Sequence, residues 1–406
     1  MERKTGVPPT WPLPPDAPPK HEIRVVVAMS GGVDSSVAAA LLKKEGYDVI
    51  GITMQLWPDD LPLGHRSETG CCSLTAVEDA RRVANRLGIP YYVVNFQEPF
   101  QEAVIDRFVD DYLRGLTPNP CLLCNQAVKF GTLLEKALEL DADYVATGHY
   151  ARVGYDPERG RYVVRKSADP RKDQTYTFYG QTQEQLKHTL TPCGEYTKDE
   201  IRAIARELGL GVAAKPDSQE ICFIPDNDYR RFLREYRPEA LRPGPIYDVD
   251  GNYLGEHQGI AFYTVGQRKG LGIAAGERLY VVRIDPERNA IIVGRADQVR
   301  EWGLAVRDVN WVSIPGIDGP TPVQAQIRYN AQPAPAVIEP VPGGGVITRF
   351  KEPQWAISPG QAVVWYDGDY LLGGGIIAGP LRPADGTADG HTNRVPDTEL
   401  TTAGRS

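Results

Sequence analysis

The sequence has little of what would assign it to several specialised classes. No apolar run approaches the length of a membrane-spanning helix, which argues against a transmembrane protein. The proline-rich first twenty residues lack the apolar middle of a signal peptide, so we expect a disordered extension and a cytoplasmic location. Six cysteines among 406 residues do not make a disulfide scaffold; without an export signal they fit reduced thiols, metal ligands or catalysts.

Positive charge is also scarce. Lys and Arg number 45 against 53 Asp and Glu, and the net charge of −8 argues against unspecific nucleic-acid binding, although it allows a local basic groove. The composition, 41% hydrophobic and 24% charged, supports a globular core. The length suggests two or three domains, and no internal repeat is visible.

What the sequence does have is a glycine turn between an apolar run, 23–29, and an alanine-rich helical pattern, 37–44. The turn reads Ser30-Gly31-Gly32-Val33-Asp34-Ser35-Ser36. Glycines there let the backbone approach an anion, and the N–H groups at a helix start point toward it. No lysine stands beside the hydroxyls, so this is not the P-loop pattern. It looks like the loop of enzymes that split ATP into AMP and pyrophosphate; the alternative is a plain core turn in which Asp34 caps the helix.

Strand-like and helix-like segments alternate up to about residue 210, which predicts a doubly wound parallel sheet. Ligands bind at the carboxyl ends of such strands. The glycine loop, Met54 and 147–149 all fall at such ends, so we expect them to converge on one crevice. The predicted strands are 24–29, 49–54, 91–95 and 144–147, and the predicted helices are 74–87, 100–114, 127–140 and the segment after a capping box at Thr197.

After about Pro225, long helices stop and prolines and glycines become frequent. One short helix, 226–236, precedes an all-β pattern typical of a small barrel. The strands predicted from about residue 280 onward include 280–284, 290–293, 323–329, 345–350 and 361–365. The predicted domains are an extension (1–20), a nucleotide-binding catalytic domain (21–225), a small central domain (226–284), a C-terminal β-barrel (285–383) and a disordered tail (384–406).

Cysteines form the second signal. Cys121 and Cys124 make a C-x-x-C pair between two prolines and a predicted helix, whose N-terminus would lower the pKa of a nearby thiol. With Cys222 they could hold three corners of an iron–sulfur cluster, or act as nucleophile and sulfur carrier. Adjacent Cys71 and Cys72 are interpreted as structural or incidental, and Cys193 as a buried turn residue without chemistry.

The motifs together resemble the tRNA-specific 2-thiouridylase family, within the ATP-pyrophosphatase superfamily. The resemblance covers 24–383. It rests on the glycine loop, Asn119-Pro120-Cys121-Leu122-Leu123-Cys124-Asn125, Ala146-Thr147-Gly148-His149-Tyr150, Lys172-Asp173-Gln174, Ile221-Cys222-Phe223, Gly255-Glu256-His257-Gln258-Gly259 and Gly266-Gln267-Arg268-Lys269-Gly270-Leu271-Gly272. The first motif alone is shared by many ATP-pyrophosphatases, whereas the ordered set is specific.

The resemblance implies an adenine nucleotide alpha hydrolase-like fold and an enzyme that adenylates the C2 oxygen of the wobble uridine of tRNA and replaces that oxygen with sulfur. It implies Cys222 as persulfide carrier and Cys124 as the second catalytic cysteine, which forms a disulfide with Cys222 as sulfur is released. ATP, with Mg²⁺, would lie on Ala28, Met29, Ser30, Gly31, Gly32, Val33, Asp34, Ser35, Met54 and Gly148. The tRNA would meet Asn119, Pro120, Cys121, His149, Lys172, Asp173, Gln174, Arg328, Tyr329 and Gln361, and a cysteine desulfurase or sulfur relay would supply sulfur.

One residue departs from the family pattern: several members carry aspartate where this chain has Cys121. A full C-x-x-C suits a [4Fe–4S] cluster on Cys121, Cys124 and Cys222, so both chemistries stay open. Rival predictions are a tRNA lysidine synthase, an amide-forming synthetase, or a non-catalytic nucleotide- or tRNA-binding protein. None of the rivals needs a C-x-x-C with a distant third cysteine.

Overall fold

The computed structural model describes residues 17–58, 74–215, 221–224, 226–273 and 276–381. These residues form two compact units, each described by itself below. Unit 1 comprises Met1–Ile105, Pro120–Asn227 and Asp369–Leu371, and unit 2 comprises Asp106–Asn119, Asp228–Gly368 and Leu372–Ser406. The predicted terminal extension up to residue 16, the tail beyond 381, and Cys71 and Cys72 lie outside the described residues. The predicted domain boundaries stay a prediction.

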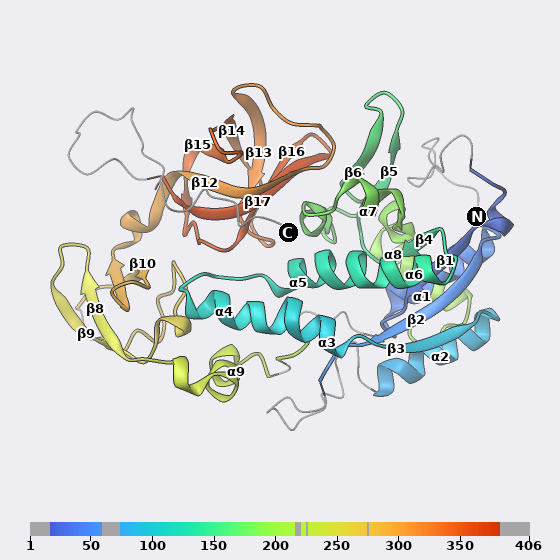
Figure 1. Ribbon diagram of the computed structural model, residues 1–406, viewed down its shortest axis with the longest axis horizontal. Helices are drawn as coiled ribbons and strands as arrows, with labels where there is room; N and C mark the ends of the chain where they lie inside the picture. The colour runs from blue at the N-terminus through green and yellow to red at the C-terminus, as the bar shows by residue number, and fades with distance from the viewer. Residues whose placement is uncertain (1–16, 59–73, 216–220, 225, 274–275, 382–406) are drawn as a thin grey trace. The chain divides into compact units, whose positions relative to one another are not determined.

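A five-stranded parallel sheet forms the centre of unit 1 (Figure 1). Its order is β3-β2-β1-β4-β7, so the chain reverses its direction of travel across the sheet between β1 and β4. Such a switch point leaves a crevice at the carboxyl ends of those strands. The strands are β1 (Arg24–Ala28), β2 (Asp48–Gln55), β3 (Tyr91–Asn95), β4 (Tyr144–Ala146) and β7 (Thr189–Leu190). The prediction of a parallel sheet is confirmed; β7, only two residues long, gave no sequence signal.

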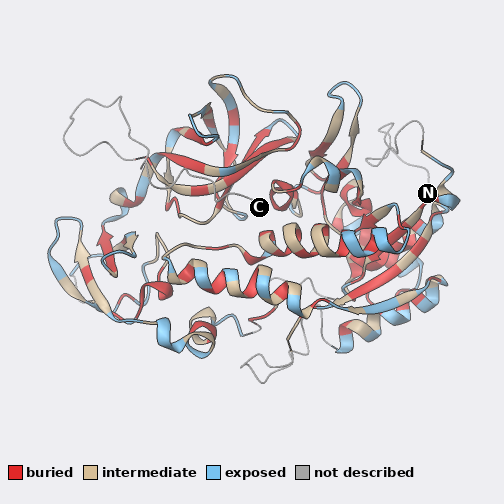
Figure 2. Cartoon of the chain, in the orientation of Figure 1, coloured by how far each residue is buried: buried red, intermediate tan, exposed pale blue. Residues whose placement is uncertain are grey.

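Three helices share one apolar core with this sheet. Small residues such as Ala38, Ala80 and Ala205 let the helices pack closely in this core, and the central valines of β1 are fully buried (Figure 2). The helices are α1 (Val33–Lys44), α2 (Leu74–Leu87) and α8 (Lys198–Glu207). The capping box at Thr197 is confirmed as the start of α8: its side chain accepts from the Glu200 N–H, and the Glu200 side chain accepts from the Thr197 N–H.

Two predicted helices start earlier than the sequence suggested. One runs from Gln97 and the other from Pro120, because proline is well tolerated in a first helical turn. The first consists of α3 (Gln97–Phe100), the π-helical η2 (Gln101–Asp106) and α4 (Arg107–Leu113). The second consists of α5 (Pro120–Leu123), the π-helical η3 (Cys124–Thr132) and α6 (Leu133–Glu139). Unit 1 also contains the hairpin of β5 (Arg152–Asp156) and β6 (Arg161–Arg165) and the elements η1 (Lys20–Glu22), η4 (Thr175–Phe178), α7 (Gln183–Lys187) and η5 (Pro192–Glu195).

Unit 2 contains a small mixed sheet and a closed barrel. The sheet has the order β10-β11-β8-β9: β8 (Gly244–Asp248), β9 (Tyr253–His257), β10 (Tyr280–Asp285) and β11 (Ala290–Gly294). The placement of 290–293 in the barrel is therefore wrong, because β11 pairs in parallel with β8. The local sequence of β11 does not indicate that its partner is a strand 45 residues earlier (Ile291 pairs with Ile246).

Six antiparallel strands form the barrel, and pairing of the first with the last closes it. Trp365 fills its interior and donates from Nε1 to Thr348 Oγ1 at 3.1 Å. The strands are β12 (Arg300–Trp311), β13 (Thr321–Gln326), β14 (Ala334–Pro340), β15 (Val346–Trp355), β16 (Ala362–Asp367) and β17 (Tyr370–Pro380). The remaining elements of unit 2 are α4, whose bounds are given above, α9 (Tyr229–Tyr236), η6 (Pro238–Ala240), η7 (Ile260–Phe262) and η8 (Ala296–Val299). The barrel prediction is confirmed, and so is the short helix, which starts at Tyr229 with Asp228 as its cap.

Candidate nucleotide and sulfur-transfer site

The glycine loop connects β1 to α1 and is held by its own hydroxyls. The Ser30 N–H donates to Ser35 Oγ at 3.2 Å, and Ser36 Oγ donates to the Gly32 carbonyl at 2.8 Å. Gly32 is the N-cap of the twelve-residue α1 and makes no side-chain capping bond. The first N–H groups of α1 therefore receive no capping bond from the side chain of the N-cap residue, which is the arrangement that binds phosphate oxygens.

Gly31 has two reasons to be glycine. Its φ of +68° is costly for other residues, and a Cβ would lie 2.2 Å from the Ala76 carbonyl oxygen of α2. Helix α2 thus packs directly against the loop. The loop conformation is fixed before any ligand arrives.

Gly148, after β4, lies against the start of α1. A Cβ at this position would stand 2.6 Å from the Ser35 backbone nitrogen and 2.7 Å from the Asp34 carbonyl carbon. The carboxyl ends of β1 and β4 therefore meet, as the sequence predicted. Met54, near the end of β2, is half-buried. Its contact with adenosine stays a prediction.

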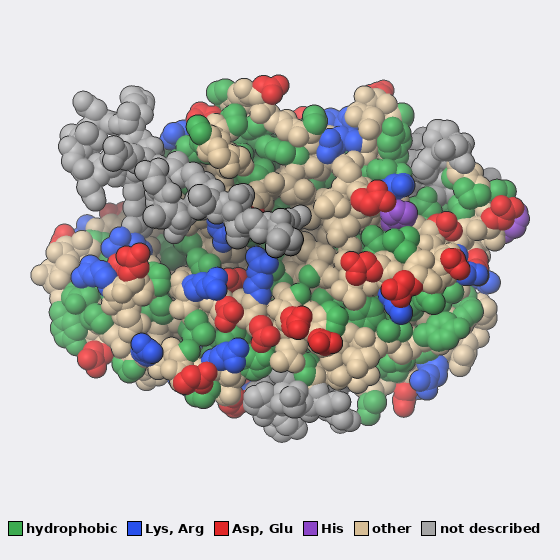
Figure 3. All heavy atoms as spheres, in the orientation of Figure 1, with side chains coloured by type: hydrophobic (Ala, Val, Ile, Leu, Met, Phe, Trp, Pro, Cys, Tyr) green, Lys and Arg blue, Asp and Glu red, His purple; other side chains and the backbone are tan. Residues whose placement is uncertain are grey.

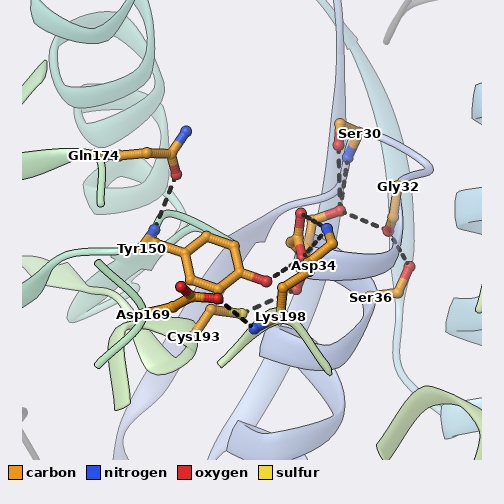
Figure 4. A network of polar contacts seen from close by, with 10 residues as sticks. Ser30, Gly32, Asp34, Ser36, Tyr150, Asp169, Gln174, Cys193 and Lys198 are labelled. Atoms are coloured by element: carbon orange, nitrogen blue, oxygen red, sulfur yellow. Dashed lines mark hydrogen bonds and ion pairs between the residues drawn. The ribbon is translucent and has the colours of Figure 1, made fainter. Parts of the chain in front are cut away.

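Asp34 is the centre of a polar network rather than a helix cap (Figure 4). Lys198 Nζ donates to both carboxylate oxygens of Asp34 at 2.8 Å, and Tyr150 donates from its hydroxyl to Oδ1 at 2.7 Å. The Tyr150 N–H donates in turn to Gln174 Oε1 at 2.9 Å. This network ties the loop, the segment after β4 and α8 together.

Lys198 was missed by the sequence reasoning, although the capping box at Thr197 placed it in the first turn of α8. Its side chain is 7% exposed, and its backbone N–H donates to Asp169 Oδ2 at 3.1 Å. Burial raises the pKa of Asp169, but hydrogen bonds from Lys198 and Arg171 outweigh it, and the pKa is lowered overall. A buried carboxylate thus fixes the first turn of α8, which aims the Lys198 ammonium at Asp34.

A second lysine, also missed, reaches the loop from the end of the described segment after α8. Lys215 Nζ donates to the Gly31 carbonyl at 3.0 Å and to Asp79 Oδ2 of α2 at 2.9 Å. The glycine loop has no lysine next to it in the sequence, but in the folded protein Lys198 and Lys215 both bind to it.

Cys193 lies under the same loop. It is fully buried in η5, and its thiol donates to the Asp34 carbonyl at 3.3 Å. Burial, followed by the proximity of Asp34, raises its pKa well above the usual value, so the thiol stays protonated. The prediction of a buried turn residue is confirmed.

The other three described cysteines all belong to unit 1. Cys121 is exposed on α5, Cys124 is buried as the first residue of π-helical η3, and Cys222 is half-buried. The residues around Cys222 are anchored: Ile224 is buried, and the Phe223 ring meets Phe100 of α3 edge-on at 5.9 Å. In the described parts of the chain, no three His, Cys, Asp or Glu side chains are grouped so as to hold a metal ion. We therefore derive no step through a cluster.

Comparison with known families identifies the chain. Residues 23–226 match the family model described as tRNA methyl transferase HUP domain, 230–295 match its PRC-barrel domain, and 301–377 match the aminomethyltransferase beta-barrel domain. The tRNA-specific 2-thiouridylase MnmA of Desulforamulus reducens is 56% identical over 88% of this chain and 98% of its own length. That of Pelotomaculum thermopropionicum is 57% identical over the same shares. The chain belongs to the tRNA-specific 2-thiouridylase family.

Solved structures of other enzymes are more distant from this 2-thiouridylase family member. A 4-thiouridine synthetase–RNA complex with bound ATP is 17% identical, covers 53% of this chain and 51% of that chain, and has a TM-score of 0.31. The assignment of the fold therefore depends on the strand order of the sheets and not on these structures. None of the helices in the described residues combines the length and hydropathy that crossing a bilayer requires.

Asp173 and Gln174, two of the positions in unit 1 where the family resemblance predicts tRNA contact, hydrogen-bond to nearby segments of unit 1. Asp173 accepts from the Ser167 N–H at 2.8 Å and from the Thr175 hydroxyl, and burial raises its pKa. Gln174 holds the Tyr150 backbone, as described above. These contacts order the segment beside Lys172; tRNA contact by the three residues stays a prediction.

His149 is held in an aromatic setting. Its ring meets Phe178 edge-on at 5.3 Å and lies 6.1 Å from the Phe130 ring, and Nδ1 is 2.8 Å from Thr147 Oγ1. Burial and the nearby Lys129 lower its pKa well below the usual value, so the imidazole is neutral. These contacts hold the neutral ring in place; contact of His149 with tRNA stays a prediction.

Three of the expected positions in unit 2 lie in the connections next to barrel strands: Arg328 and Tyr329 follow β13, and Gln361 precedes β16. Gln361 donates from Nε2 to the carbonyl of Thr117 at 3.0 Å and to that of Pro118 at 3.4 Å, so it holds the segment that leads to Asn119. Arg328 donates to the Trp355 carbonyl, while Tyr329 is 38% exposed. Lys and Arg side chains are interspersed with Asp and Glu on the face in Figure 3, as the net charge suggests.

Proposed function

We propose that this 2-thiouridylase family member uses ATP to replace the C2 oxygen of the wobble uridine of tRNA with sulfur. The observation that carries the proposal is the contact of Gly148 with the backbone of Ser35 and Asp34, which joins two strand ends at an anion loop. The same compact unit contains Cys124 and Cys222. The proposed ATP-binding loop and the two proposed catalytic cysteines thus belong to the same unit.

In the first step the uridine O2 attacks the α-phosphorus of ATP. The bond from that phosphorus to the bridging oxygen breaks, and pyrophosphate leaves with the electron pair. The N–H groups of the glycine loop stabilise the phosphate oxygens. The product is uridine with AMP on O2, which turns a poor leaving oxygen into a good one. Mg²⁺ is proposed to enter with the phosphates.

In the second step a persulfide on Cys222 supplies sulfur. Its terminal sulfur bonds to C2, and AMP leaves with the C2–oxygen bond pair. The Cys124 thiolate then attacks the Cys222 sulfur, the sulfur–sulfur bond breaks toward the uridine, and a Cys124–Cys222 disulfide forms. A thiol reductant restores both thiols, and a cysteine desulfurase or sulfur-relay protein reloads Cys222.

The burial of these cysteines supports the division of roles. Cys222 is half-buried and is followed by the anchored Phe223 and Ile224, which suits a sulfur carrier that meets both a donor protein and the nucleotide. Cys124, one residue after α5, begins a π-helical stretch, a feature that often marks functional sites. Exposed Cys121 is proposed to meet the target base with Asn119 and Pro120.

The test is incubation of the protein with ATP, a persulfide donor and unmodified tRNA, followed by nucleoside analysis. We expect 2-thiouridine from the unaltered protein and none from Cys222→Ser or Cys124→Ser, with ATP binding within about twofold of normal in both. The iron content of anaerobically purified protein separates the two sulfur chemistries: protein that forms 2-thiouridine without iron uses a persulfide, whereas a cluster requires iron that Cys121→Ser loses together with the product. Full activity of both Cys222→Ser and Cys124→Ser overturns the mechanism.

Another reaction class remains to be compared, because the family model's description names a methyl transferase. A methyl transfer would not consume ATP to AMP and pyrophosphate. A lysidine synthase would make an amine adduct and would tolerate serine at both cysteines. The same nucleoside analysis therefore distinguishes these rivals by the product formed.

A further inference from the structure

Lys215 brings a positive charge to the glycine loop, which carries none of its own. Between Ala28 and Ser36 the only ionisable side chain is Asp34. ATP brings several negative charges to this loop, and pyrophosphate gains further charge as it leaves. Loops of other nucleotide enzymes place a lysine among the loop residues for this purpose. Here the sequence has no such neighbour, and the fold supplies the cation from 184 residues away.

Two lysines reach the loop, and their surroundings differ. Lys198 gives its ammonium to both oxygens of Asp34 and is 7% exposed, so its charge is neutralised inside the protein. Lys215 is 33% exposed and donates to the carbonyl of Gly31, the residue whose backbone forms the turn. Its ammonium therefore stands at the loop and remains accessible to a ligand.

The partner of Lys215 does not cancel the local charge. Asp79 accepts from Lys215 at 2.9 Å on Oδ2 and from Arg82 Nη2 at 2.6 Å on Oδ1. Burial raises the pKa of Asp79, but these two cations lower it overall, so it is ionised. Lys215 and Arg82 share the single carboxylate of Asp79, so Asp79 alone does not neutralise both cations.

Asp79 also fixes where Lys215 stands. It lies three residues after Ala76, whose carbonyl packs against Gly31, so both are on the face of α2 that meets the loop. The contact with Gly31 and the contact with α2 hold the Lys215 ammonium from two sides. A flexible side chain is thereby positioned before ATP binds.

We infer that Lys215 is a catalytic residue that contacts the phosphates of ATP which leave as pyrophosphate. This inference rests on the proposed function. As the uridine O2 bonds to the α-phosphorus, the bond to the bridging oxygen breaks and its electron pair moves onto pyrophosphate. The Lys215 ammonium stabilises that charge and transfers no proton. Asp79 is a positioning residue that acts through Lys215.

Binding of ATP and AMP to single variants tests the inference, because only ATP carries the leaving phosphates. Lys215→Met should raise the dissociation constant of ATP more than about tenfold and that of AMP less than about twofold, and should slow pyrophosphate release about 100-fold. Lys215→Arg keeps the charge and should fall between Met and normal. Lys44→Met, which removes an exposed charge from the far end of α1, should match the unaltered protein.

The outcomes separate the two proposals. If Lys215→Met binds ATP and releases pyrophosphate normally, the role of Lys215 is overturned while 2-thiouridine formation by the unaltered protein keeps the function. If ATP and AMP weaken equally, Lys215 merely shapes the loop and the inference also fails. Absence of 2-thiouridine from the unaltered protein refutes the function, and the ATP-against-AMP comparison still decides whether Lys215 meets the phosphates. Retained AMP binding shows that the variant is folded.

Discussion

Lys198 Nζ lies 2.8 Å from both carboxylate oxygens of Asp34, across 164 residues of sequence. This pair connects the first turn of α8 to the second residue of α1. Because α1 carries the loop on its N-terminal end, the pair positions the N–H groups proposed to bind ATP. Tyr150 completes the set of donors to Asp34.

Lys198→Met should destabilise the protein. The substitution leaves the partly buried Asp34 carboxylate with Tyr150 as its donor. The expected loss in the free energy of unfolding is about 2 kcal/mol. This is below the usual range for buried ion pairs because the Asp34 side chain is 30% exposed. Urea unfolding measures it. Lys187→Met, on the half-exposed end of α7, should change the free energy of unfolding by less than about 0.5 kcal/mol. Equal stability of the two variants would contradict the role of the pair.

Gly148→Ala should weaken ATP binding with little general unfolding. The new Cβ would stand 2.6 Å from the Ser35 nitrogen and push the start of α1 away from β4. Isothermal titration with ATP measures the effect, expected to exceed about tenfold in the dissociation constant. Gly211→Ala, where nothing lies within 4 Å of the added Cβ, is the matched control. Normal ATP binding by Gly148→Ala would show that the loop tolerates movement here.

Acid should destabilise the protein partly through His149. Its pKa in the folded state lies well below the usual value, so the unfolded chain gains a proton as the pH falls through about 6.5 while the folded chain does not. His149 therefore does not reduce the free energy of unfolding above about pH 6.5, and reduces it increasingly as the pH falls below that value. The melting temperature of His149→Gln should fall less between pH 7.5 and about pH 5.5 than that of the unaltered protein. His21→Gln, which removes an exposed imidazole, is the control; identical pH profiles for His149→Gln and the unaltered protein would refute this cause.

Gln361→Ala should weaken the use of tRNA and leave ATP binding unchanged. Gln361 holds the carbonyls of Thr117 and Pro118, which precede the residues proposed to meet the target base. We expect the KM for tRNA to rise about fivefold, because about fivefold corresponds to the free energy of one hydrogen bond. Gln354→Ala removes a similar bond, to the Glu352 carbonyl, on an exposed part of β15 and should have no effect. A changed dissociation constant for ATP in Gln361→Ala would show that the effect is not confined to tRNA.

Local patterns predicted much of this fold. Four of the five strands of the parallel sheet, α2 and the cap of α8 follow from apolar runs, end glycines and one capping box. The meeting of Gly148 with the loop also followed, since the carboxyl ends of parallel strands share one edge. These features depend on residues close together in the chain.

The features that the sequence could not predict are long-range pairings. Nothing near Lys215 or Lys198 indicates a partner 184 or 164 residues away. The two residues of β7 are too few for a periodicity, and β11 carries no sign that it pairs with β8. The roles of the cysteines came from a resemblance, because burial and element position do not distinguish a sulfur carrier from a cluster ligand.

The most direct measurement is a single-turnover reaction with ATP labelled at the α-phosphorus, unmodified tRNA and a persulfide donor. The account predicts one AMP for each 2-thiouridine formed at the wobble position, and neither sulfur incorporation nor a Cys124–Cys222 disulfide with Cys222→Ser. Formation of 2-thiouridine without AMP, or its undiminished formation by Cys222→Ser, would contradict the account.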